Sequence, residues 1–238
     1  MTSPVRADLQ RPIERVGNDP SLITDIPIHE CGERLVEVRP EPGLWTAPAY
    51  HARGISSAPD RIVVRESVLV RLREASSLLP SGTGLLLWDG LRTLRTQADI
   101  VEDFRAGPPE QDRDATVEKY LALPPSSEQA FRESPPPHST GGAVDLTLCD
   151  ETGHPLDMGA DFDEFADTAW LAHFEDAVHP NPRAAEYRER RRILYWAMIQ
   201  AGFAPYPWEY WHYEFGTAVA AVFYHLPFAS YGAAVPWN

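Results

Sequence analysis

The sequence has little positive charge, few cysteines and no long apolar run. Its 238 residues include 21 Lys and Arg against 35 Asp and Glu, which gives a formal net charge of −14. A protein that binds duplex nucleic acid needs a basic surface to displace counterions from the phosphates, so we expect no nucleic-acid partner. No stretch approaches the roughly 20 apolar residues that cross a bilayer, and no apolar signal-peptide run follows the polar N-terminus, so we expect no membrane association.

Only two cysteines are present, Cys31 and Cys149, which is too few for a disulfide scaffold. We therefore expect a soluble cytoplasmic protein. Hydrophobic residues make up 43% of the chain and include 7 Trp, 9 Tyr and 9 Phe, so a sizeable core can form. The chain has no internal repeat and no linker between two cores. We expect one domain over 25–238, preceded by an N-terminal arm over 1–24.

The spacing of apolar residues predicts a mixture of helices and strands. Helices are expected over 60–79, 94–104, 115–123 and 183–201. Strands are expected over 85–88, 142–149 and 208–215. Asp60 is the expected N-cap of the first helix, Gly202 closes the last one, and the proline-rich stretch 124–137 is expected to be a loop. Because these elements do not alternate as strict βαβ units, the predicted fold class is α+β.

Two segments place histidines near carboxylates. His138 precedes the strand over 142–149, Asp145 lies on the polar face of that strand, and Glu209 and His212 lie three residues apart among aromatic residues. Two histidines, one carboxylate and an open fourth position can form a catalytic zinc site, and a second carboxylate can accept the proton of the attacking water. Spacing alone leaves a structural alternative open, in which His138 caps a turn, Asp145 lies at a strand edge and His212 is buried in the core.

The spacing of Glu209 and His212 raises a geometric difficulty. Their positions have opposite parity, so a straight strand would direct the two side chains to opposite faces of the sheet. Both can approach one metal only if a bulge, a bend or the start of the strand falls between them. The surrounding aromatic residues are consistent with either a walled pocket or an ordinary core.

Four segments match the motifs of one peptidase family in order and separation. They read GLLLWDGLR at 84–92, HSTGGAVDLTL at 138–148, MGADFD at 158–163 and EYWH at 209–212. From about Pro40 to Phe215 this pattern resembles that of the D-alanyl-D-alanine dipeptidases, zinc peptidases of family M15 that include the vancomycin-resistance dipeptidase. The resemblance implies one domain with a small central antiparallel sheet, flanking helices and a zinc site in a confined cleft.

The resemblance also implies a role for each matched residue. The zinc ligands would be His138, Asp145 and His212. Glu209 would deprotonate the zinc-bound water and pass the proton to the leaving amine, and Arg92 would stabilise the oxyanion of the tetrahedral intermediate. Asp89 and Asp163 would lie near the amino terminus of the substrate, although Asp89 is equally consistent with a turn residue before Gly90.

The chain departs from the family beside the first zinc histidine. The family has serines there that help to hold the amino terminus of the dipeptide, whereas this chain has Pro136 and Pro137, which offer neither a hydroxyl nor an N–H donor. Thr93 stands where the family has proline, and Thr140 where it has arginine. The residues that the resemblance assigns to zinc binding and catalysis are therefore all present, while the residues that would bind the substrate are partly replaced.

We expect a zinc-dependent metallopeptidase that hydrolyses a dipeptide or short amide, with D-Ala-D-Ala or a related D-amino-acid dipeptide as the substrate. A confined site favours a dipeptide over cross-linked cell wall. Two other functions stay open. One is the hydrolysis of a modified amide in specialised metabolism, which Pro136 and Pro137 motivate, and the other is dipeptide binding without catalysis. The intact Glu209 and Arg92 argue against the second, because a binding protein needs neither.

Overall fold

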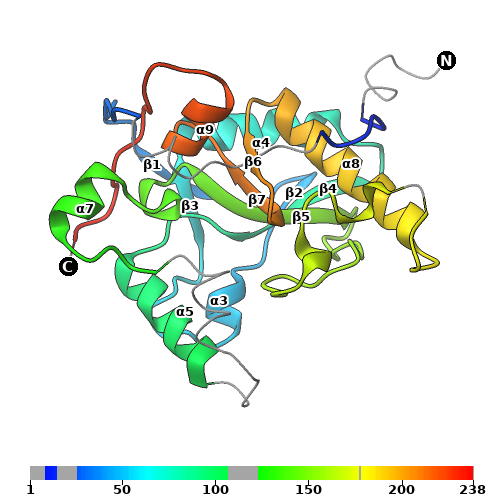
Figure 1. Ribbon diagram of the computed structural model, residues 1–238, viewed down its shortest axis with the longest axis horizontal. Helices are drawn as coiled ribbons and strands as arrows, with labels where there is room; N and C mark the ends of the chain where they lie inside the picture. Colours follow the sequence, from blue (N-terminus) through cyan, green and yellow to red (C-terminus); the bar gives the residue numbers. More distant parts are fainter. Residues whose placement is uncertain (1–8, 15–25, 107–122, 177, 238) are drawn as a thin grey trace.

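A five-stranded sheet forms the centre of the protein (Figure 1). Across the sheet the strands are β2 (Leu44–Thr46), β4 (Thr83–Asp89), β5 (Ala143–Asp150), β7 (Glu209–Glu214) and β6 (Ala204–Tyr206). All neighbouring strands are antiparallel except β2 and β4, which are parallel. The structure is a computed structural model that describes residues 9–14, 26–106, 123–176 and 178–237. The predicted single α+β domain with a central, mostly antiparallel sheet is confirmed.

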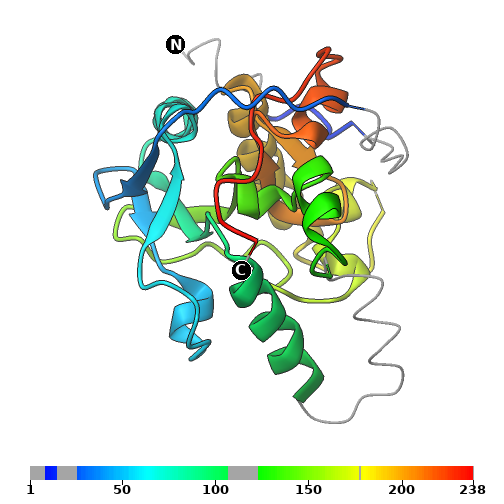
Figure 2. The same cartoon turned by 90° about the vertical axis from the view of Figure 1, so that its left-hand side faces the viewer.

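Two long helices cover one face of this sheet. The helix α8 (Ala184–Gln200) contacts β5, β6 and β7, and α4 (Glu66–Leu78) contacts α8 and β2. Buried apolar side chains fill the layer between these helices and the sheet, among them Val68, Leu72, Leu85, Leu87, Leu146, Leu148, Leu194 and Met198. On the other side of the sheet, α3 (Ala49–Ala52) and α5 (Leu94–Ala106) lie together below it (Figures 1 and 2).

The remaining elements are short. They are β1 (Leu35–Val38), β3 (Ile62–Arg65), α7 (Glu128–Glu133), α9 (Ala218–Phe223) and the 3₁₀ turns η1 (Pro137–Thr140), η2 (Asp167–Ala169) and η3 (His173–Glu175). Leu9 and Ile13, in the described part of the N-terminal segment, are buried in the main core. No helix within the described ranges is long and apolar enough to span a membrane.

The helix predicted over 60–79 begins only at Glu66, so the expected boundary and the expected N-cap at Asp60 are wrong. Residues 62–65 form β3, which pairs with β1 in an antiparallel two-stranded sheet. Three successive β-branched residues, Ile62 to Val64, favour this extended conformation. Val64 and Val68 are four residues apart, which is a helical spacing, so the sequence pattern does not reveal the boundary between β3 and α4 that lies between them.

Two other predictions need correction. The stretch 124–137, predicted as a loop, contains α7, whose N-cap Ser127 accepts a hydrogen bond from the Ala130 amide (3.1 Å). The strand over 142–149 is confirmed as β5, but it is buried on both faces, Asp145 and Thr147 included, because it lies in the middle of the sheet. The helices over 94–104 and 183–201 and the strands over 85–88 and 208–215 are confirmed. Most of the helix predicted over 115–123 lies outside the described residues.

Candidate metal centre and active site

His138, Asp145 and His212 converge on one point at the centre of the sheet. Asp145 on β5 lies opposite His212 on β7, and His138 comes from the η1 turn immediately before β5. All three side chains are buried, and their ligand atoms lie within 4.8 Å of one another. Of the described residues, these three form a group that could hold a metal ion.

The separations within this group suit a tetrahedral metal. His138 Nε2 lies 3.3 Å from both His212 Nδ1 and Asp145 Oδ2, and His212 Nδ1 lies 3.0 Å from Asp145 Oδ1. Ligands bound to zinc at about 2.0–2.1 Å in tetrahedral geometry are about 3.3 Å apart. Two imidazoles and one carboxylate are also a donor set that zinc accepts, and they leave a fourth position for water or substrate. The residues therefore fit a catalytic zinc ion.

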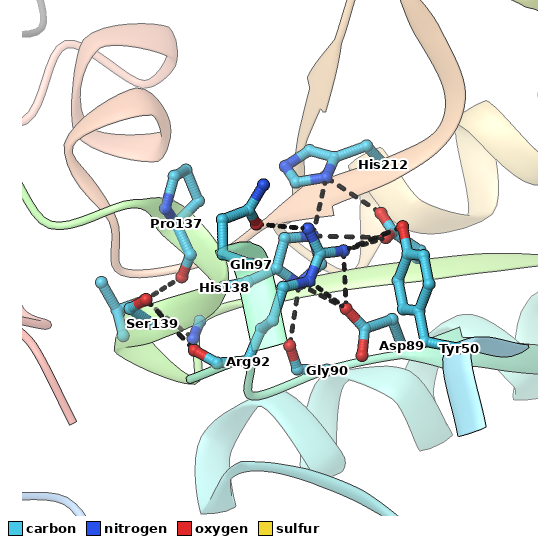
Figure 3. Close-up of polar contacts among 12 residues, drawn as sticks. Tyr50, Asp89, Gly90, Arg92, Gln97, Pro137, His138, Ser139 and His212 are labelled. Atoms are coloured by element: carbon cyan, nitrogen blue, oxygen red, sulfur yellow. Dashed lines mark hydrogen bonds and ion pairs between the residues drawn. The ribbon is translucent and has the colours of Figure 1, made fainter. Parts of the chain in front are cut away.

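Hydrogen bonds behind each imidazole orient it toward the group. His138 Nδ1 lies 2.8 Å from the carbonyl oxygen of Gly90, so Nδ1 donates there and Nε2 is left with a free lone pair (Figure 3). His212 Nε2 lies 3.1 Å from Glu214 Oε1, on the side away from Asp145. The sequence analysis missed Glu214, although its two-residue spacing from His212 places both side chains on one face of β7.

The buried charges around the imidazoles favour a cation. Burial alone would raise the pKa of Asp145, but His138 and His212 hold this pKa well below its usual range. Burial opposes a proton on His212, yet hydrogen bonds to Asp145 and Glu214 raise the pKa of this imidazole. The carboxylates of Asp145 and Glu214 thus both contact the imidazole of His212, and a divalent cation nearby would balance their negative charge.

Glu209 lies next to the group but outside it. Its Oε2 is 4.0 Å from His212 Nδ1, and a quarter of its side chain is exposed (25%). Glu209 is the first residue of β7, and the β6–β7 register shifts between Pro205 and Tyr206, so the opposite parity of 209 and 212 is no obstacle. Burial raises the pKa of Glu209 to about 8. A carboxyl group of this kind can accept and return a proton near neutral pH.

Arg92 also lies next to the group, just beyond β4. Its guanidinium donates to Asp89 Oδ2 (2.8 Å), Gln97 Oε1 (2.7 Å), the Tyr50 hydroxyl (3.3 Å) and Asp145 Oδ2 (3.4 Å) (Figure 3). Burial opposes its charge, but Tyr50, Asp89 and Asp145 raise the pKa of Arg92. The structure therefore places Asp89 as a partner that holds Arg92 beside the candidate metal position.

Asp163 faces the same space from the loop after β5. It has a left-handed backbone (φ 58°), accepts a hydrogen bond from Tyr50 (3.1 Å) and pairs with Arg53 Nη1 (2.6 Å). Burial raises the pKa of Asp163 to about 6 despite Arg92 and Arg53. Tyr50 and Arg53 were missed by the sequence analysis, because no local pattern links them to a residue 110 positions away.

Comparison with known proteins bears on this arrangement. Residues 52–231 match the peptidase M15 family, described as D-Ala-D-Ala dipeptidase. A D-alanyl-D-alanine dipeptidase of Synechocystis sp. is 30% identical over 87% of this chain and 94% of its own. The D-alanyl-D-alanine dipeptidase of Enterococcus faecalis is 34% identical over 65% of this chain and 74% of its own. That of Escherichia coli is 31% identical over 67% of this chain and 70% of its own.

This chain belongs to the peptidase M15 family. The resemblance drawn from the four motifs is thereby confirmed, and the protein is a metallopeptidase. The matched region contains every residue of the candidate metal centre, together with Glu209, Arg92 and Asp163.

Proposed function

We propose that the protein is a zinc dipeptidase that cleaves D-Ala-D-Ala or a related D-amino-acid dipeptide. The observation that carries this proposal is the group of His138, Asp145 and His212 at tetrahedral separations, with Glu209 next to His212 and Arg92 next to Asp145. Zinc held by the three ligands would act as a Lewis acid toward the substrate carbonyl and lower the pKa of the attacking water.

The remaining steps fall to side chains of the chain itself. Glu209 accepts the proton of the attacking water and returns it to the leaving amine, for which its raised pKa is suited. Arg92, buried and fixed by Asp89 and Gln97, stabilises the negative charge that develops on the carbonyl oxygen. Asp163, with Asp89 nearby, receives the amino terminus of the substrate.

A second candidate function is the hydrolysis of a modified peptide or amide. Pro136 and Pro137 remove two hydroxyl groups at the substrate's amino terminus, and Arg53 already pairs with Asp163. Both features weaken the recognition of a free ammonium group and favour a substrate in which that group is blocked. In either case the partner is a small molecule. The free thiols of Cys31 and Cys149 are consistent with the cytoplasm as its place of action.

A panel of dipeptides tests the proposal. Release of free amino acid is measured from D-Ala-D-Ala, other D,D-dipeptides, L-Ala-L-Ala and N-acetyl-D-Ala-D-Ala, with zinc-loaded and chelator-stripped protein. We expect zinc-dependent cleavage of D,D-dipeptides. Cleavage confined to the N-acetylated substrate would support the second function, and turnover that persists in fully stripped protein would contradict the metal mechanism.

A further inference from the structure

A buried carboxylate lies directly behind one of the candidate metal ligands. Glu214 is 1% exposed, and its ion-pair partner among the described residues is His212. Its Oε1 lies 3.1 Å from His212 Nε2, and its Oε2 accepts a hydrogen bond from Thr217 Oγ1 (2.5 Å). Both oxygens are therefore engaged on the side of His212 that faces away from His138 and Asp145.

The local fold fixes this carboxylate in place. Positions 212 and 214 share one face of β7, so the two side chains lie side by side. Thr217 is the N-cap of α9, where its hydroxyl oxygen accepts a hydrogen bond from the Ala220 amide (3.2 Å). Because that oxygen accepts from α9, its own hydrogen is free to donate to Glu214. A chain of hydrogen bonds thus connects the start of α9 to His212.

This arrangement determines which imidazole nitrogen faces the metal position. A neutral imidazole has one N–H donor and one acceptor nitrogen, and a carboxylate beside Nε2 keeps the donor there. The lone pair of Nδ1 then points toward Asp145 and His138. A carboxylate acceptor also makes the imidazole a stronger electron donor than a backbone carbonyl does. His138 Nδ1 instead has the Gly90 carbonyl at 2.8 Å, with Asp89 Oδ2 farther away at 3.5 Å.

We propose that Glu214, held by Thr217, is a positioning residue that orients His212 and sets the affinity of the site for zinc. The inference rests on the proposed zinc site. It predicts an effect on metal binding itself, in the absence of substrate, because Glu214 acts through His212 and faces away from the position of the reacting groups.

Zinc dissociation constants, measured by competition with a chromophoric chelator, test the proposal. We expect Glu214→Ala to weaken zinc binding about 10–100-fold. Glu214→Gln, which keeps an acceptor oxygen but loses the charge, should fall between this variant and the wild type. Thr217→Ser keeps the hydroxyl and should bind zinc as the wild type does. A folded Glu214→Ala variant with the wild-type dissociation constant would overturn the proposal.

Two further comparisons keep the outcome unambiguous. Glu33 is the control, because its carboxylate likewise accepts side-chain hydrogen bonds, from the hydroxyl groups of Tyr231 (2.9 Å) and Ser67 (3.0 Å), but among the described residues it contacts no candidate ligand. Glu33→Gln should lower stability and leave zinc affinity unchanged. If Glu214→Ala does not fold, an unchanged dissociation constant in Glu214→Gln overturns the proposal. A wild-type protein that binds no zinc would instead overturn the zinc site on which the inference rests.

Discussion

Every nitrogen of the Arg92 side chain has a fixed acceptor in the site. A lysine carries a single ammonium group and cannot reach Asp89, Gln97 and the Tyr50 hydroxyl at once. We expect Arg92→Lys to lower kcat about 10²–10³-fold, the usual effect of removing an oxyanion donor. Steady-state kinetics on the zinc-loaded variant measure this. Arg95→Lys, at an exposed position of α5, is the control and should keep the wild-type kcat; an equal loss in both variants would refute the role of Arg92.

The ionised form of Asp163 destabilises the folded protein. Its pKa rises from 3.8 to about 6 on folding, so the folded state binds more protons between these values and stability falls as pH increases through them. Above pH 6 this difference in pKa lowers the free energy of unfolding by about 3 kcal/mol. Asparagine tolerates the left-handed backbone and carries no charge.

We therefore expect the free energy of unfolding of Asp163→Asn to exceed that of the wild type by about 1–3 kcal/mol at pH 7.5. This gain in stability should vanish below pH 4. Urea unfolding of both zinc-free proteins at the two pH values measures the difference. A variant less stable than the wild type at pH 7.5 would show that the ion pair with Arg53 outweighs the burial of Asp163.

At the scale of elements, local sequence patterns predicted the long helices and the central strands, but not the junctions that depend on pairing. The helix over 60–79 was predicted too long because residues 62–65 pair with β1 as a strand, which the local spacing of apolar residues does not show. The geometry of Glu209 and His212 could not be predicted either, because the register shift depends on β6 as a partner. The motif residues of the site were predictable, whereas Tyr50 and Arg53 enter it through tertiary packing alone.

The loop that carries Asp163 depends on one buried side chain of α8. Arg191, 1% exposed, donates to the backbone carbonyls of Met158 (2.9 Å), Trp170 (2.6 Å) and Thr168 (2.7 Å). Methionine would fill similar space but would leave the carbonyls of Met158 and Thr168 without their Arg191 donor, whereas the Trp170 carbonyl would keep the His173 amide (3.0 Å). We therefore expect Arg191→Met to lower the free energy of unfolding by about 3 kcal/mol.

Thermal or urea unfolding measures this effect, with Arg183→Met as the control. Arg183 is the N-cap residue of the same helix, and it pairs with Asp157 and Glu186 at the surface, where such pairs contribute about 0–1 kcal/mol. Similar losses in the two variants would contradict the role given to Arg191.

At the scale of the whole molecule, the proposed zinc ligands come from two segments, around 138–145 and 212, that are far apart in the sequence and meet only in the folded chain. Zinc should therefore stabilise the fold by mass action, by about 2.7 kcal/mol at one hundred times its dissociation constant. For a chain of this size we expect the melting temperature to rise by about 5–10 °C. His138→Ala should abolish the rise, and His154→Ala, whose imidazole is exposed, should keep it. A rise that survives in His138→Ala would place the metal elsewhere.

The most direct test of the account is the turnover of the best substrate of the dipeptide panel by wild-type protein and Glu209→Gln at equal zinc content. Glutamine keeps the shape of the side chain but cannot accept the proton of the attacking water. We predict one equivalent of zinc in both proteins and a kcat about 10³-fold lower in the variant. A zinc-loaded variant that turns over at the wild-type rate would contradict the proposed mechanism.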